Sequence, residues 1–200
     1  MKVSETFFFL KPLILTLLFV SLRLNAHTEP VATVDSLHNA LLTVASMEGE
    51  DNFRKKYSLL EPTVKKCFDF RKIAKLVTGR YWEEGSKSER EDFEKSLIGV
   101  AVHNYILNFG GNSNLQFKLV KKKIRANKAI IETSLISSGD AITKLKYVLY
   151  KKEEEWFIVN VVARGVSDLS LKRADYMRFL ESDSLGNLAK QIYARTKKIY

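Results

Sequence analysis

The single cysteine of the chain is the first residue that could do chemistry. Cys67 precedes Asp69 by two positions in the stretch CFDFRKIAKLVTGRYW, so one interpretation is a thiol nucleophile with an orienting carboxylate. A reactive thiolate needs a histidine or another group that lowers its pKa, and the three histidines of the chain are all distant from Cys67 in the sequence. Asp69 is also well placed to cap a helix that ends at Gly79. We therefore expect Cys67 to be a small buried residue and Asp69 to be a helix cap.

Other reactive patterns are equally weak. No pair of Cys or His residues stands at metal-ligand spacing, and the run 153–155 of glutamates is typical of a hairpin turn. Gly110 and Gly111 end a predicted helix, whereas a phosphate-binding loop opens one. Ser167 lacks the second glycine of a G-x-S-x-G motif, and no histidine follows it in the chain. The sequence thus predicts a protein that is not an enzyme and that has no metal or cofactor.

Residues 1–26 have the order of a secretory signal peptide. Lys2 and Lys11 flank an aromatic run, an apolar segment follows, and Ala26 offers a small residue for cleavage. The apolar run is short for a membrane span, and an uncleaved N-terminal anchor is the alternative. No later stretch reaches the roughly 18 apolar residues that a span requires. We expect an exported chain in which residues 27–200 form a single domain.

The composition is basic, with a formal net charge of +10 for the whole chain. Removal of residues 1–26 takes away three cations and one acid, which leaves +8. Such a chain could meet nucleic acid, an anionic membrane or an acidic protein, and charge alone does not choose among them. Phe117, Tyr147 and Tyr150 on basic strands would suit base stacking, but export separates the chain from nucleic acid. The lysine cluster 121–123 is expected to be a solvated face.

Periodicity divides the domain into helices, then strands, then helices again. The predicted helices cover about 34–49, a segment from 52, 70–79 and 86–109, and further helices begin near Leu169 and Leu185. The predicted strands are 115–124, 128–137, 141–151 and 156–165, joined by short turns. This order favours an α+β layout with one antiparallel sheet packed against helices.

Several helix ends have recognisable signals. Asp35 or Ser36 is expected to cap the first helix, and Pro62 to limit the second or to begin the next. Ser86 and Ser88 are each followed three residues later by a glutamate, so two overlapping capping boxes are possible.

The segment 97–109 is apolar around most of its helical circumference. A helix of this kind is buried on more than one side, either in a thick core or against a ligand. An apolar ligand between this helix and the sheet is one interpretation. The alternative is that the same side chains only fill one another.

Many residues resemble the central block of the MlaC or toluene-tolerance family of periplasmic lipid-binding proteins. They are Phe68, Asp69, Ile73, Ala74, Gly79, Tyr81, Trp82, Arg90, Phe93 and Tyr105. The C-terminal run Gly165-Val166-Ser167, with Arg173 and Tyr176 after it, is similar to that family's G-[VI]-S block. The resemblance covers about residues 34–195.

This resemblance implies an α+β fold like the NTF2-type cone, with a strongly curved antiparallel sheet of four to five strands wrapped by helices around an apolar cavity. It also implies a shuttle that carries phospholipid across the periplasm. The implied partners are an outer-membrane lipoprotein and porin complex, an inner-membrane ABC transporter complex, and the membrane surface in transient contact. The segment SDLSLKRADY is closer to the hopanoid-associated HpnM branch, so a hopanoid is an alternative cargo. A non-lipid interaction module is the other alternative.

The predicted lipid site lies between helix 97–109 and the inner face of the sheet. Its candidate residues are Tyr81, Trp82, Leu97, Val100, Tyr105, Leu119, Leu135, Tyr147, Leu149 and Phe157. Tyr81 and Trp82 are expected near the mouth, where an aromatic ring with a polar edge suits a half-wet position. Arg80 or Arg164 near the rim would attract anionic head groups or an acidic partner. An ordinary core contact is the alternative for each wall residue.

Overall fold

The structure is a computed structural model that describes residues 29–47, 52–111, 114–137 and 142–197 of the chain. The predicted signal peptide lies outside the described residues, so its cleavage stays a prediction. None of the described helices combines the length and the apolar character that a membrane crossing needs.

The elements follow the predicted order of helices, strands and helices, and the α+β prediction is confirmed. The five N-terminal helices are α1 Pro30–Ala45, α2 Phe53–Cys67, α3 Phe70–Thr78, α4 Tyr81–Glu84 and α5 Lys87–Phe109. The strands are β1 Gln116–Arg125, β2 Lys128–Ile136, β3 Ile142–Lys152, β4 Glu155–Ala163 and β5 Val166–Ser167. The last helices are α6 Asp168–Leu180 and α7 Leu185–Lys197.

The strands form one curved antiparallel sheet in the order β1-β2-β3-β4-β5. Register shifts between Leu119 and Lys121 and between Val148 and Leu149 interrupt the ladders, and such bulges increase strand twist. The β3–β4 turn places Glu153 and Glu154 at φ 49 and 68, as expected for a two-residue hairpin turn. Periodicity predicted four strands and missed β5, which has only two residues, whereas the family resemblance implied four to five strands.

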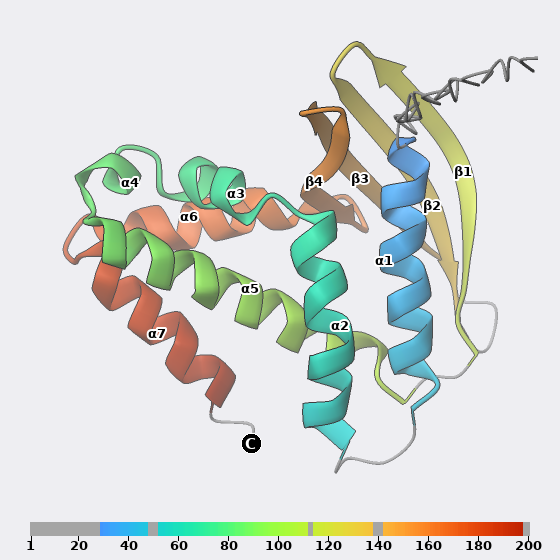
Figure 1. Cartoon of the computed structure of the whole chain (residues 1–200), viewed down its shortest axis with the longest axis horizontal. Helices are drawn as coiled ribbons and strands as arrows, with labels where there is room; N and C mark the ends of the chain where they lie inside the picture. Colours follow the sequence, from blue (N-terminus) through green and yellow to red (C-terminus); the bar gives the residue numbers. More distant parts are fainter. Residues whose placement is uncertain (1–28, 48–51, 112–113, 138–141, 198–200) are drawn as a thin grey trace, which may run out of the picture.

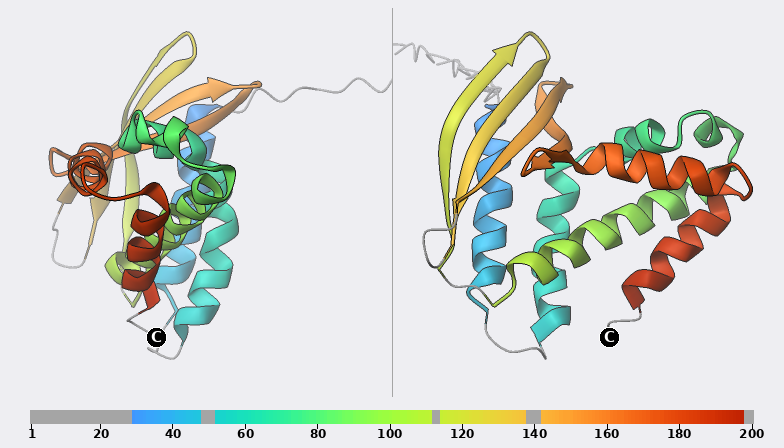
Figure 2. Two further views of the ribbon diagram at one scale, coloured as in Figure 1. Left: turned by 90° about the vertical axis from the view of Figure 1, so that its left-hand side faces the viewer. Right: turned by 180° about the vertical axis from the view of Figure 1, so that it is seen from behind.

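Helix α1 lies across the inner face of the sheet, and α2 packs beside it (Figure 1). The Thr33 hydroxyl donates a hydrogen bond to the Trp156 carbonyl oxygen at 3.1 Å, which fixes α1 over β4. Between α2 and α3 the Asp69 amide donates to the Ile158 carbonyl oxygen at 3.3 Å. The other helices extend sideways from the sheet, with α5 between α2 and α7 and with α4 at the end farthest from the sheet (Figures 1 and 2).

Most predicted helix ends are confirmed, and two differ. Ser86 and Glu89 form the capping box of α5, and Gly79 ends α3 at φ 58. Helix α1 begins four residues earlier than its expected start, at Pro30, because proline is favoured in the first turn. Pro62 lies inside α2: buried residues on both sides of it hold the helix together, although proline cannot donate the usual backbone hydrogen bond.

Candidate functional site

Cys67 and Asp69 have structural roles. The Cys67 thiol is 2% exposed and donates to the Thr33 carbonyl oxygen at 3.4 Å. Burial raises the pKa of this thiol to about 11, so it is protonated at neutral pH and is a poor nucleophile. The Asp69 carboxylate accepts a hydrogen bond from the Lys72 amide at 2.8 Å and another from the Tyr150 hydroxyl. The cap assigned to Asp69 from the sequence is thus confirmed.

Replacement of Asp69 by alanine should lower the free energy of unfolding by about 2 kcal/mol, because both the cap of α3 and the hydrogen bond to Tyr150 are lost. Tyr150→Phe removes only the second bond and should cost about 1 kcal/mol. Urea unfolding measures both. Equal losses of unfolding free energy in the two variants would show that the cap contributes nothing to stability.

The residues that carry the family resemblance hold the helical layer together. Arg173 of α6 donates to the Leu76 carbonyl oxygen next to the C-terminal Gly79 of α3. The rings of Phe93 and Tyr176 meet edge to face at 5.8 Å between centroids and join α5 to α6. The Ser167 hydroxyl caps α6 by accepting from the Ser170 amide at 3.1 Å. These contacts give each of these motif residues a structural role, which does not require catalysis.

The inner face of the sheet is unevenly covered. On β2 near the β1–β2 turn this face is covered, with Ala129 and Ile131 at 1% and 0% exposure, whereas Ile124 of β1, which is paired with Ala129, is 42% exposed. Leu135 farther along β2, and Val161 and Ala163 of β4, are only half-buried on this face. Apolar side chains at the far end of β2 and on β4 are therefore left partly accessible.

Helix α5 brings aromatic side chains to this accessible end. The ring centroids of Tyr105 and Phe109 are 6.1 Å apart, and those of Phe109 and Phe117 are also 6.1 Å apart. Phe117 of β1 is paired with Leu135 of β2. All four side chains are half-buried. We call these four residues, together with Val161 of β4 on the same face of the sheet, the inner strip.

A polar group lies beneath the inner strip. His38 Nε2 and the Tyr147 hydroxyl are 2.9 Å apart, and Phe117 stacks on the His38 ring at 3.8 Å between centroids. Burial lowers the pKa of His38 to about 4, so the imidazole is neutral at pH 7. Burial, with the nearby Tyr147 and Asp168, raises the pKa of Tyr105 well above its ordinary value. The strip therefore carries no charge at neutral pH.

The predicted site residues divide into those at the inner strip and those in the core. Tyr105 and Leu135 belong to the strip, and Val100 of α5 is likewise half-buried. Leu97, Tyr147 and Leu149 are 1%, 2% and 1% exposed, so they are residues of the packed core.

The remaining predicted residues lie elsewhere. Leu119 is on the inner side of β1 but is 53% exposed. Phe157 pairs with Tyr150 and contacts its ring, which places it on the outer face, opposite to Ile158. Tyr81 and Trp82 are in α4, at the far end of the helical layer (Figure 1). The structure does not bring these last three residues to the inner face.

Sequence reasoning missed three members of the inner strip. Phe109 was counted only as an apolar residue of its helix, Phe117 as a possible stacking residue, and Val161 as part of a strand. The alternation of β1 and β4 contained the signal for the last two, but the bulge between Val148 and Leu149 hides which residues of β3 and β4 share a face.

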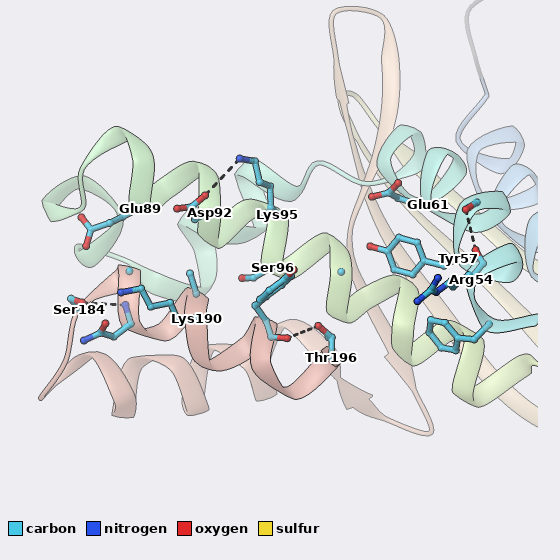
Figure 3. Close-up of a pocket in the computed structure, with 17 residues that line it drawn as sticks. Arg54, Tyr57, Glu61, Glu89, Asp92, Lys95, Ser96, Ser184, Lys190 and Thr196 are labelled. Atoms are coloured by element: carbon cyan, nitrogen blue, oxygen red, sulfur yellow. Dashed lines mark hydrogen bonds and ion pairs between the residues drawn. The ribbon is translucent and has the colours of Figure 1, made fainter. Parts of the chain in front are cut away.

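A concavity lies between α2, α5 and α7, with a volume of about 1200 Å³ (Figure 3). Tyr57 and Arg54 of α2 stand at one end, and Glu89 of α5 and Lys190 of α7 stand at the other. We call this surface the helical groove. Its charged lining suits a polar or amphipathic molecule better than bare acyl chains. None of the predicted lipid-site residues lines it.

Among the described residues, no group of three His, Cys, Asp or Glu side chains could hold a metal ion.

Comparison with known proteins identifies the family of this chain. A sequence model of the family described as "MlaC protein" matches residues 34–194. The chain belongs to this family. A search of curated proteins finds no match.

A solved structure shares the fold. It is the phospholipid-binding protein from Ralstonia solanacearum in complex with a phospholipid, with a TM-score of 0.75 and 14% sequence identity. The match covers 86% of this chain and 99% of the other. The fold prediction of an NTF2-like α+β domain is confirmed.

Proposed function

We propose that the protein is a periplasmic carrier of phospholipid, the soluble component of an ABC-type lipid transport system between the outer and inner membranes. One observation carries this proposal: the half-buried, uncharged inner strip on the inner face of the sheet. Membership in the MlaC family and the phospholipid bound by the Ralstonia protein support it.

The physical need for such a carrier follows from the cost of exposing acyl chains to water. Each methylene costs about 0.8 kcal/mol, so a chain of roughly sixteen carbons costs on the order of 12 kcal/mol. Lipid therefore does not cross an aqueous compartment unaided. A carrier has to bury the tails and can leave the head group outside.

The proposed site uses the inner strip as the surface against which the tails lie. Tyr105 and Phe109 contribute from α5, and Phe117, Leu135 and Val161 contribute from the sheet. Arg164 is exposed and directly follows the half-buried Ala163 at the edge of this surface. We propose that its guanidinium meets an anionic head group. Val100 and the core residues Leu97, Tyr147 and Leu149 complete the wall.

The chemistry of the site supports binding without catalysis. The buried thiol of Cys67 is protonated, and His38 is neutral and bonded to Tyr147. Ser167 is held by Asn160 Nδ2 at 3.0 Å and caps a helix. The hopanoid-binding alternative uses the same inner strip, because a pentacyclic triterpenoid is also a large apolar ligand.

Native mass spectrometry of the protein purified without detergent should show a bound mass in the phospholipid range, and extraction of the same sample should release that lipid. A triterpenoid would move the proposal to hopanoid transport. A ligand-free mass that persists after incubation with liposomes would contradict lipid carriage and favour an interaction module.

A further inference from the structure

The positive charge of the protein is concentrated on three strands. Strands β1, β2 and β3 contain ten lysine and arginine residues and one carboxylate, Glu132. Their net charge of +9 compares with +10 for the whole chain. The helices together with the rest of the chain are close to neutral, so the basic character belongs to the sheet.

Most of these cations share one face. Residues paired across an antiparallel sheet lie on the same side of it, so the register assigns each cation to a face. The outer face carries Lys118, Lys121, Lys123, Arg125, Lys128, Lys144 and Lys146. All seven are exposed. We call this set the basic face.

The basic face is uncovered and weakly neutralised. Seen from behind, β1 and β2 have no helix in front of them, because α1 lies on the other side (Figure 2). Glu132 Oε1 lies 3.8 Å from Lys146 Nζ and forms an ion pair with it. Among the described residues, the other six cations of the basic face have no ion pair. The six other positive charges of the basic face therefore face solvent.

Aliphatic side chains lie between the cations. Ile130, Ile136 and Val148 are half-buried on the same outer face, and Ile142 is 63% exposed. Lysine stems can lie along such aliphatic surface while their ammonium groups reach outward. A row of cations from Lys118 to Arg125 extends roughly 23 Å along β1, at about 3.3 Å per residue.

We infer that the basic face docks the protein on an anionic membrane surface. Six of the seven cations are lysines, which act as hydrated point charges and suit a diffuse layer of phosphates. An acidic protein surface is usually recognised by arginine forks in fixed geometry, and this face has only Arg125. Exposed aliphatic residues among lysines are also typical of interfacial binding. This inference depends on charge and geometry alone, so it is independent of the cargo.

The test is co-sedimentation of the isolated protein with vesicles. Vesicles of phosphatidylcholine with about one third phosphatidylglycerol should pellet the protein at low salt, and pure phosphatidylcholine vesicles should not. The triple variant Lys118→Gln, Lys121→Gln, Lys123→Gln should lower the partition coefficient on the order of 100-fold, at about fivefold for each lysine. Thermal unfolding should be nearly unchanged, since all three side chains are exposed.

The matched control removes the same charge from helices. Lys55→Gln, Lys87→Gln, Lys190→Gln changes three exposed lysines of α2, α5 and α7 and should lower partitioning less than about threefold. Equal losses in both triples would overturn the inference, as would failure of the unmodified protein to pellet with anionic vesicles. A protein that only extracts lipid stays in the supernatant with lipid bound, so lipid carriage and membrane docking can fail separately.

Discussion

Val161→Arg should abolish lipid loading, with at least a tenfold fall in the lipid that co-purifies with the protein. Val161 is half-buried on the inner face of β4 and is paired with Tyr147. An arginine there places a guanidinium against the tails, and an uncompensated charge in apolar surroundings costs several kcal/mol. Since about 1.4 kcal/mol is a tenfold change in affinity, the loss should be complete in practice. Native mass spectrometry measures it.

The neighbouring valine supplies the control. Val162 is also half-buried but is paired with Lys146, which puts it on the outer face. Val162→Arg should keep its lipid. Val161→Trp adds volume without charge and serves if Val161→Arg does not fold. Leu149→Arg is unsuitable, because Leu149 is 1% exposed and a charge there would unfold the core.

A further variant separates the inner strip from the helical groove. Gly99 is in the lining of the groove, and a Cβ added to it would have only the Tyr57 hydroxyl within 4 Å, at 3.8 Å. Gly99→Trp therefore fills the groove with little strain, and the inner strip is unchanged. Loss of lipid in this variant, with retention in Val161→Arg, would move the lipid site to the groove.

The fold could be predicted from the sequence because its signals are local. The change from helical to alternating periodicity predicted the order of helices and strands, and the turns at Ala126 and at 153–154 were correctly placed. Asp69, Gly79 and Ser86 gave correct helix ends because each cap depends on neighbours within a few residues. The prediction that Pro62 limits the second helix was wrong, because tertiary packing on both sides of Pro62 outweighs the cost of one missing hydrogen bond.

The candidate site was harder to predict because it depends on which faces meet. Phe157 was expected on the inner face together with Leu149, but alternation along β4 places it with Tyr150 on the other side. Leu97 and Tyr147 were expected to line the lipid site, yet only the three-dimensional packing shows that they are fully covered. Sequence pattern finds an apolar face, and it cannot tell which part of that face remains accessible.

The two aromatic residues of α4 also differ in how much of each side chain is accessible. Trp82 was expected at the mouth of the site, but it is 1% exposed, and the Arg90 guanidinium carbon lies 6.0 Å from its ring centroid. Tyr81 beside it is half-buried, and its hydroxyl accepts a hydrogen bond from Arg80 at 3.1 Å. These contacts hold the far end of the helical layer, away from the sheet.

Trp82→Ala should therefore lower the free energy of unfolding by about 3–5 kcal/mol, because a large side chain leaves a cavity in a packed core. For a domain of this size, the loss should lower Tm by roughly 6–20 °C. Trp82→Phe keeps most of the packing and removes an indole N–H that has no partner among the described residues, so it should cost less than about 1.5 kcal/mol. Tyr81→Ala should cost about 1 kcal/mol or less.

Calorimetry measures Tm, and mass spectrometry of the folded protein should find its lipid retained in all three variants. Loss of lipid with an unchanged Tm in Trp82→Ala would instead return this residue to the mouth of the site.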